Sequence, residues 1–150
     1  MPGYNFKANF MIPFSELRIG NYVLIDSIVR KIAMISSIED KTQWPSVGYY
    51  VGEDLHFIGC DSEHLQAVSL SNNELEKSGF LFDSYFKLWQ KPKLATGTGM
   101  EMELDRDYNV VDFLRRPLLK EVKSMHRLQN LYYALLGKEL VFVPGQAVAY

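Results

Sequence analysis

The sequence contains a single cysteine, Cys60, and therefore cannot form an intramolecular disulfide. Nothing in its cysteine content points to an oxidising compartment, because small secreted domains usually carry several paired cysteines. No apolar run approaches the roughly 20 residues that a membrane-spanning helix requires. An excess of one charge is also lacking, since 16 basic residues are balanced by 18 acidic ones. We therefore expect a cytoplasmic protein with no membrane partner, and one that does not coat nucleic acid over its whole surface.

Recognisable catalytic and metal-binding signatures are lacking as well. His56, Cys60 and His64 are spaced four residues apart and are ligand types that suit zinc, but they lack a paired C-x-x-C or H-E-x-x-H pattern. The surroundings of Cys60 match no family of nucleophilic cysteines, whether His64 or His126 is taken as its partner. The turn from Gly97 to Gly99 is followed by neither a lysine-serine pair nor a helix, as a phosphate loop would be. We expect no metal, no cofactor and no catalytic residue, hence a protein that is not an enzyme.

The length and the hydrophobic content of the chain suit a single domain. A chain of 150 residues with 47% hydrophobic content can bury a sizeable core. We expect an N-terminal arm over residues 1–12, a single domain over 13–143 and a C-terminal tail over 144–150. The arm is rich in aromatic residues, which predicts that it docks on its own domain or on a neighbour.

Residues 22–38 fit two structures. Their isoleucines match one face of a helix, whereas their β-branched density and a possible turn at Asp26 and Ser27 match a hairpin of Tyr22–Ile25 and Ile28–Ile38. We favour the hairpin. Further strands are expected at Gly48–Val51, at Leu55–Ile58, once or twice within Phe80–Gln90, at Met100–Tyr108 and at Leu140–Val143.

Two helices follow from local signals. Ser71 and Glu74 form a capping-box pattern, and the short helix that they open ends at Gly79. A longer helix near the C-terminus ends at Gly137. Its apolar face is predicted to consist of Leu128, Leu131, Tyr132 and Leu135. Early strands and a late helix indicate an α+β fold with a mostly antiparallel sheet, and a small SH3-like barrel is one arrangement open to its N-terminal half.

Three blocks occur in order along the chain: Glu16-Leu-Arg-Ile-Gly-Asn-Tyr-Val23, Leu70-Ser-Asn-Asn-Glu-Leu-Glu-Lys-Ser-Gly-Phe80 and His126-Arg-Leu-Gln-Asn-Leu-Tyr-Tyr-Ala-Leu-Leu-Gly-Lys-Glu-Leu140. With them the chain resembles a family of small uncharacterised proteins encoded by Bacteroidota and by their phages and mobile elements. The middle block departs from that family, because Ser69 and Ser71 replace its usual proline and threonine. The resemblance implies a genomic context and no activity. The family pattern after the first block also looks like a strand pair, which favours the hairpin.

Charged residues are segregated in the second half of the chain. On an extended strand, Glu101, Glu103, Asp105 and Asp107 would point to one side. Such a side suits an exposed edge strand that blocks aggregation, a cation site or a surface for a basic partner. Basic residues follow at positions 115, 116, 120, 123 and 127, and they either pair with the acidic row or leave two patches of opposite sign. The predicted partner-binding residues are Tyr4, Phe6, Phe10, Glu101, Glu103, Asp105, Asp107, Arg115 and Arg116.

An aromatic and basic pattern gives a second hypothesis. Tyr85, Lys87, Trp89 and Lys91 alternate, so one strand face would show aromatic rings between lysines. Proteins that bind single-stranded nucleic acid stack bases on such rings while lysines contact phosphates. The same pattern also arises from ordinary packing on a solvated strand.

Polar residues in the C-terminal helix, namely His126, Gln129 and Asn130, suggest buried hydrogen bonds to adjacent strands. The leading hypothesis is a non-catalytic accessory protein of a phage or mobile element that binds a protein partner or itself. The alternatives are a single-stranded nucleic-acid-binding protein and a protein that sequesters a small ligand such as a nucleotide.

Overall fold

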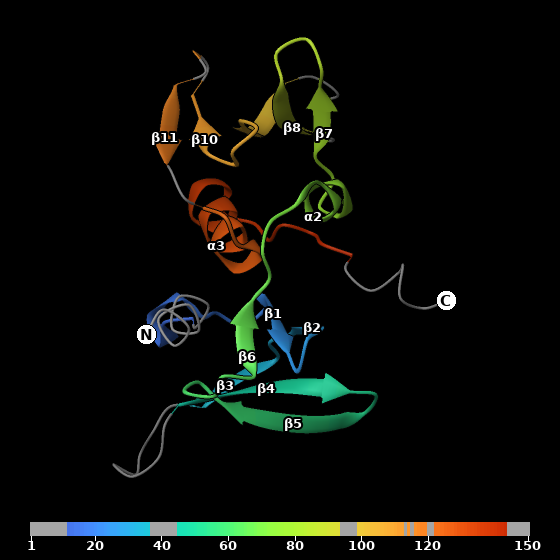
Figure 1. Cartoon of the computed structure of the whole chain (residues 1–150), viewed down its shortest axis with the longest axis vertical. Coiled ribbons are helices and arrows are strands. Elements are labelled where there is room, and N and C mark those ends of the chain that lie inside the picture. The colour runs from blue at the N-terminus through green and yellow to red at the C-terminus, as the bar shows by residue number, and fades with distance from the viewer. Residues whose placement is uncertain are drawn as a thin grey trace, which may run out of the picture. The chain divides into compact units, whose positions relative to one another are not determined.

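The computed structural model of the chain describes residues 12–36, 45–93, 99–112, 114, 116–119 and 122–143. These residues form a mixed α+β structure with three antiparallel sheets, which confirms the predicted fold class (Figure 1). No helix within the described ranges is both long enough and apolar enough to cross a membrane. The chain divides into two compact units, Met1–Val68 (unit 1) and Ser69–Tyr150 (unit 2). The expected arm, apart from Ile12, and the expected tail lie outside the described residues. The single domain stays a prediction, because two compact units are compatible with one domain.

Unit 1 contains a short 3-10 helix and two three-stranded sheets. The helix η1 spans Phe14–Glu16. The first sheet has the order β2-β1-β6, with β1 at Tyr22–Ile25, β2 at Ile28–Lys31 and β6 at Leu65–Ala67. The second sheet has the order β3-β4-β5, with β3 at Met34–Ser36, β4 at Ser46–Val51 and β5 at Asp54–Gly59. The described strands of this unit therefore form two open sheets and do not close into an SH3-like barrel.

The predicted hairpin is confirmed. Asp26 and Ser27 have φ angles of 51° and 66°, and β1 and β2 pair in antiparallel register on either side of them. Positive φ at both central residues is typical of the type I′ turn, whose twist matches that of the flanking strands. The second strand is shorter than expected because the chain leaves the first sheet at Ile32, and the N–H of Ala33 donates to the carbonyl of Gly48 in the other sheet.

A cluster of buried apolar residues joins the two sheets of unit 1. It consists of Ile12, Leu17, Val23, Ile25, Ile32, Val47, Cys60 and Leu65. Ile12, the last residue of the expected arm, is only 5% exposed and belongs to this core. The strands expected at Gly48–Val51 and Leu55–Ile58 are confirmed, as parts of the slightly longer β4 and β5.

Unit 2 contains a five-stranded antiparallel sheet and two helices. In chain order these elements are α2 at Asn72–Lys77, β7 at Leu81–Asp83, β8 at Leu88–Pro92, β9 at Met100–Leu104, β10 at Val110–Val111, β11 at Pro117–Leu119 and α3 at Met125–Leu136. The strand order β11-β10-β9-β8-β7 follows the sequence, so each strand pairs with its neighbours in the chain. In Figure 1, α2 and α3 lie toward the same end of this sheet.

Both predicted helices are confirmed at the ends that glycine marks. Gly79 follows α2 with φ 85°, and Gly137 caps α3 with φ 71° while its N–H donates to the carbonyl of Tyr133 at 2.8 Å. Left-handed backbone of this kind is accessible to glycine without the steric penalty of a Cβ atom. At the start of α2, the Ser71 hydroxyl donates to the carboxylate of Glu74, so the capping-box pair is in contact.

The predicted apolar face of α3 is wrong in part. Leu128 and Tyr132 are buried, but Leu135 is 60% exposed, and His126 and Gln129 are 2% and 1% exposed. The buried face of α3 therefore includes the polar residues His126 and Gln129 in its N-terminal half and excludes Leu135 near its C-terminal end. His126, Gln129 and Asn130 each make at least one further interaction within the protein, as buried polar groups generally do.

Two expected strands differ from the prediction. β9 ends at Leu104 because a carboxylate oxygen of Asp105 accepts the N–H groups of Asp107 and Asn109, which closes a turn that competes with a strand ladder. Leu140–Val143 forms no strand within the described residues. The Val143 N–H donates to the carbonyl of Lys77, the last residue of α2, at 3.3 Å, so this bond joins the segment to a helix and not to a strand.

Candidate binding surfaces

The acidic row predicted on β9 does not form an open charged face. β9 is the central strand of its sheet, so the expectation of an edge strand is wrong. The Glu101 carboxylate accepts hydrogen bonds from the Tyr132 hydroxyl of α3 and from Lys138. The bond from Lys138, followed by that from Tyr132, lowers the pKa of Glu101. Glu103 accepts from the side-chain amide of Gln90 at 2.7 Å.

The other two acidic residues lie in the turn that follows β9. The Asp105 carboxylate accepts from the Asn109 side-chain amide at 3.0 Å in addition to its two backbone N–H bonds. Asp107 is exposed. Consequently Asp105 and Asp107 do not share a strand face with Glu101 and Glu103, and the role of all four in partner binding stays a prediction.

Of the predicted basic residues, Arg116 pairs with a carboxylate outside the acidic row. Arg116 lies 3.0 Å from Asp112 in the β10–β11 connection, and Asp112 also accepts the N–H groups of Leu114 and Arg116. The backbone bond from Arg116 is the main cause that lowers the pKa of Asp112. Lys138, which was not among the predicted basic residues, neutralises Glu101. Arg115 lies outside the described residues, as do Tyr4, Phe6 and Phe10.

The predicted aromatic and lysine face is not formed. Tyr85 and Lys87 lie in the turn between β7 and β8, where Asp83 accepts the N–H groups of Tyr85 and Phe86. Tyr85 is 84% exposed, whereas Trp89 is 5% exposed within β8. A buried indole cannot offer its face to a base. Nucleic-acid binding by these residues and Lys91 stays a prediction, but the strand geometry on which it depended is wrong.

The cysteine and histidines of unit 1 have separate roles. The His56 ring stacks on Tyr49 with centroids 5.8 Å apart, and His64 Nδ1 lies 3.0 Å from an Asp26 carboxylate oxygen. Cys60 belongs to the core, where burial and then the charge of Asp61 raise its thiol pKa. In the part of the chain that the structure describes, no three His, Cys, Asp or Glu side chains are grouped so that they could hold a metal ion.

One exposed surface is the outer face of the β3-β4-β5 sheet. Register pairing places Met34, Gly48 and Phe57 in one row across the three strands, with Tyr50 and Leu55 in the next. Met34, Tyr50 and Phe57 are 43%, 55% and 51% exposed. The opposite face carries Val47, Ile35 and Ile58 and packs on the core of unit 1. This sheet is therefore apolar on both faces, which we call inner and outer.

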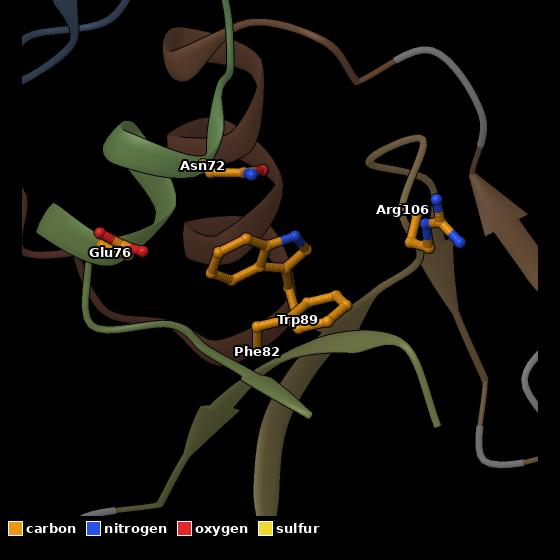
Figure 2. Close-up of a pocket in the computed structure, with 5 residues that line it drawn as sticks. All are labelled: Asn72, Glu76, Phe82, Trp89 and Arg106. Carbon is orange, nitrogen blue, oxygen red and sulfur yellow. The ribbon is translucent and has the colours of Figure 1, made fainter. Parts of the chain in front are cut away.

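A groove in unit 2 is the second exposed surface (Figure 2). Its first part is a cavity of about 450 Å³ lined by Asn72, Glu76, Phe82, Trp89 and Arg106. Figure 2 shows Phe82 and Trp89 between the α2 side chains and Arg106. Its second part is a cavity of about 630 Å³ lined by Ser69, Leu70, Arg106, Asp107, Tyr108, Asn109 and Lys123. Because Arg106 lines both cavities, they adjoin one another.

Of the residues of this groove, the sequence analysis named Trp89, Asp107 and Lys123 as candidates, but it did not place them in one site. Arg106 lies between Asp105 and Asp107, so the strand expected over Met100–Tyr108 would have placed it on the side opposite the acidic row. The available signal was the run Asp105-Arg-Asp-Tyr-Asn109, since Asp and Asn at these spacings are typical of turns. Recognising that turn would have ended β9 early and placed Arg106 at its tip.

No protein-family model, no curated protein and no solved structure matches this chain. The resemblance of its three blocks to proteins of Bacteroidota and their phages stays a prediction.

Proposed function

We propose that this chain is a non-catalytic binding protein that associates with a second copy of itself through the outer face of the β3-β4-β5 sheet. The observation that carries the proposal is the exposure of Met34, Tyr50 and Phe57 side by side on one sheet face. An antiparallel sheet with one face on the core usually presents polar side chains on the other. Contiguous exposed apolar residues mark an interaction site more often than scattered ones do.

Charge favours a second copy as the occupant. The residues that the three strands contribute to this face are Met34, Ser36, Ser46, Gly48, Tyr50, Leu55, Phe57 and Gly59, none of which is charged. A two-fold interface brings the same patch of both subunits together, so any charge on it meets its like. An uncharged face avoids that repulsion. Aromatic residues and methionine are also enriched in interface cores.

The centre of the face is closely packed. A Cβ atom added to Gly48 would lie 3.0 Å from the Phe57 ring and 3.2 Å from the Met34 Cβ. The side chains of Phe57 and Met34 therefore close over the glycine and form a continuous surface instead of standing apart. Side chains that are already packed against one another lose little conformational entropy when they are covered.

Sedimentation equilibrium of the full chain tests the proposal. We expect a monomer–dimer equilibrium, and we expect Phe57→Lys to shift it to monomer because two lysines would face each other across the two-fold axis. Phe86→Lys is the matched control, since Phe86 is also a phenylalanine with a comparable exposed fraction (44%) but belongs to unit 2 and not to this sheet. Circular dichroism verifies that both variants are folded. A wild-type chain that stays monomeric, or a dimer that survives Phe57→Lys unchanged, refutes the proposal.

Removing residues 1–11 distinguishes another occupant, the aromatic arm of the same chain. Ile12 is retained because it belongs to the core of unit 1. If the truncated chain dimerises while the full chain does not, the arm covers the face and the second copy is excluded. If both dimerise and Phe57→Lys disrupts both, the second copy is the occupant.

A further inference from the structure

We propose that the groove of unit 2 binds a nucleotide, with the base in the aromatic cavity and the phosphate between Arg106 and Lys123. This inference is independent of self-association, because every residue that lines the groove belongs to unit 2. Both cavities lie within the range of about 300–1,000 Å³ that is usual for small-molecule sites.

Two adjacent rings, tilted against each other, form the aromatic side of the first cavity. Phe82 and Trp89 are register partners on β7 and β8, and their ring centroids lie 5.2 Å apart at 59°. Trp89 is 5% exposed and so fixes the position of Phe82, which is 45% exposed. Figure 2 shows the two rings lying next to one another inside the cavity. Any of the nucleic-acid bases can stack on such a supported ring, because every base has a flat aromatic face.

Polar groups of α2 face the same cavity. Asn72 and Glu76 are four residues apart and therefore lie on one side of the helix. The Asn72 amide oxygen accepts from the Tyr108 hydroxyl at 2.8 Å, which orients its NH₂ group as a donor. The Glu76 carboxylate is an acceptor. A donor and an acceptor beside an aromatic ring match the ring nitrogens and exocyclic amines on the edge of a base.

Arg106 and Lys123 supply the positive charge. Neither side chain makes an ion pair with the residues that the structure describes, whereas Arg116 and Lys138 do. Arg106 lines both cavities and Lys123 lines the second, so an anionic group beside Arg106 remains within reach of the aromatic cavity. A guanidinium matches the geometry of phosphate oxygens. Glu76 and Asp107 also line the groove, so the charges of its two acidic and two basic side chains cancel. A groove with no net charge favours a monophosphate over the more highly charged triphosphate.

Isothermal titration of the full chain with adenosine 5′-monophosphate, adenosine and inorganic phosphate tests the inference. We expect adenosine 5′-monophosphate to bind more tightly than adenosine alone or inorganic phosphate alone. Arg106→Ala should lower affinity for the monophosphate about tenfold and lower that for adenosine, which has no phosphate, much less. Phe82→Ala should weaken both. Arg30→Ala, which removes an equal charge from unit 1, is the matched control and should change neither.

Guanosine, cytidine and uridine monophosphates extend the titration to other bases. If none of the four monophosphates binds below about 1 mM, or if Arg106→Ala binds as the wild type does, the inference is wrong. An adenosine octanucleotide distinguishes the source of the nucleotide. Tighter binding of the octamer than of the monophosphate, with a steep dependence on salt, identifies a nucleic-acid strand, whereas equal binding per nucleotide identifies the free compound.

Discussion

In unit 1, the outer face of the β3-β4-β5 sheet presents Met34, Tyr50 and Phe57 and no charged side chain. In unit 2, the central strand of the five-stranded sheet carries Glu101 and Glu103, and each carboxylate accepts a hydrogen bond from a side chain elsewhere in the unit. The apolar side chains of the outer face are thus exposed, while the two carboxylates are engaged inside the protein.

This difference shows that a charged residue is a poor guide to a binding surface until its local partners are known. Asp105 and Asp112 each accept backbone N–H groups of the turn that they occupy, so they maintain loop structure. Arg106 and Lys123, by contrast, make no ion pair with the described residues and line the groove. The groups available to a partner or ligand are therefore those that folding leaves unengaged.

The largest effect is expected inside unit 2, at the helix that supports its sheet. Leu128→Ala removes a side chain that is 0% exposed and should lower the free energy of unfolding by about 2–5 kcal/mol. Leu135→Ala is the matched change on a side chain that is 60% exposed, and it should cost less than about 0.5 kcal/mol. Urea denaturation measures both. Equal losses would show that the face of α3 predicted from the sequence, with Leu135 buried, is right after all.

A smaller effect is expected when an engaged carboxylate is neutralised. Glu101→Gln retains the shape of the side chain but removes the charge that Tyr132 and Lys138 face, and we expect a loss of about 1–3 kcal/mol in urea denaturation. Asp107→Asn neutralises an exposed carboxylate that makes no ion pair with the described residues, and it should have almost no effect. If the two substitutions cost the same, the contrast between engaged and unengaged charges disappears.

Local signals made much of this fold predictable. The hairpin followed from Asp26 and Ser27, and the ends of both helices followed from Gly79 and Gly137, because these residues favour turns or a left-handed backbone by themselves. In unit 1, β1 and β2 followed from β-branched density, whereas β6 at Leu65–Ala67 was not expected. No knowledge of distant contacts was needed for any of the elements that were expected.

Features that depend on tertiary neighbours could not be predicted. Trp89 alternates with lysines in sequence, yet it is buried beneath Phe82 because β7 turns back onto β8. The buried face of α3 depends on what packs against it, so a polar residue such as Gln129 is enclosed while Leu135 is exposed. The groove escaped prediction for the same reason, since its walls come from α2, two strands and a turn.

The engaged carboxylates also give stability a pH dependence. Hydrogen bonds from Lys138 and Tyr132 lower the pKa of Glu101 in the folded chain, so the unfolded chain binds more protons as the pH falls. The stabilisation is present above the unfolded pKa, near about 4.3, and is lost as the pH falls through the folded value. Urea denaturation between pH 7 and pH 3 should show the difference between wild type and Glu101→Gln shrinking below about pH 5. A constant or growing difference contradicts the role of these bonds.

The smallest change in the free energy of unfolding is expected for a substitution on the outer face of the β3-β4-β5 sheet. A substitution on the inner face of the same strand, β4, serves as the control. Val47 and Tyr50 lie on opposite faces of that strand, 0% and 55% exposed. Val47→Thr places a hydroxyl in the core and should cost about 1–3 kcal/mol. Tyr50→Thr keeps a residue with good strand propensity and should change the unfolding free energy of the dilute monomer by less than about 0.5 kcal/mol. Because Tyr50 would serve association and not folding, the same variant should weaken dimerisation in sedimentation equilibrium. A Tyr50→Thr chain that unfolds as readily as Val47→Thr would show that the outer face is already covered within the molecule.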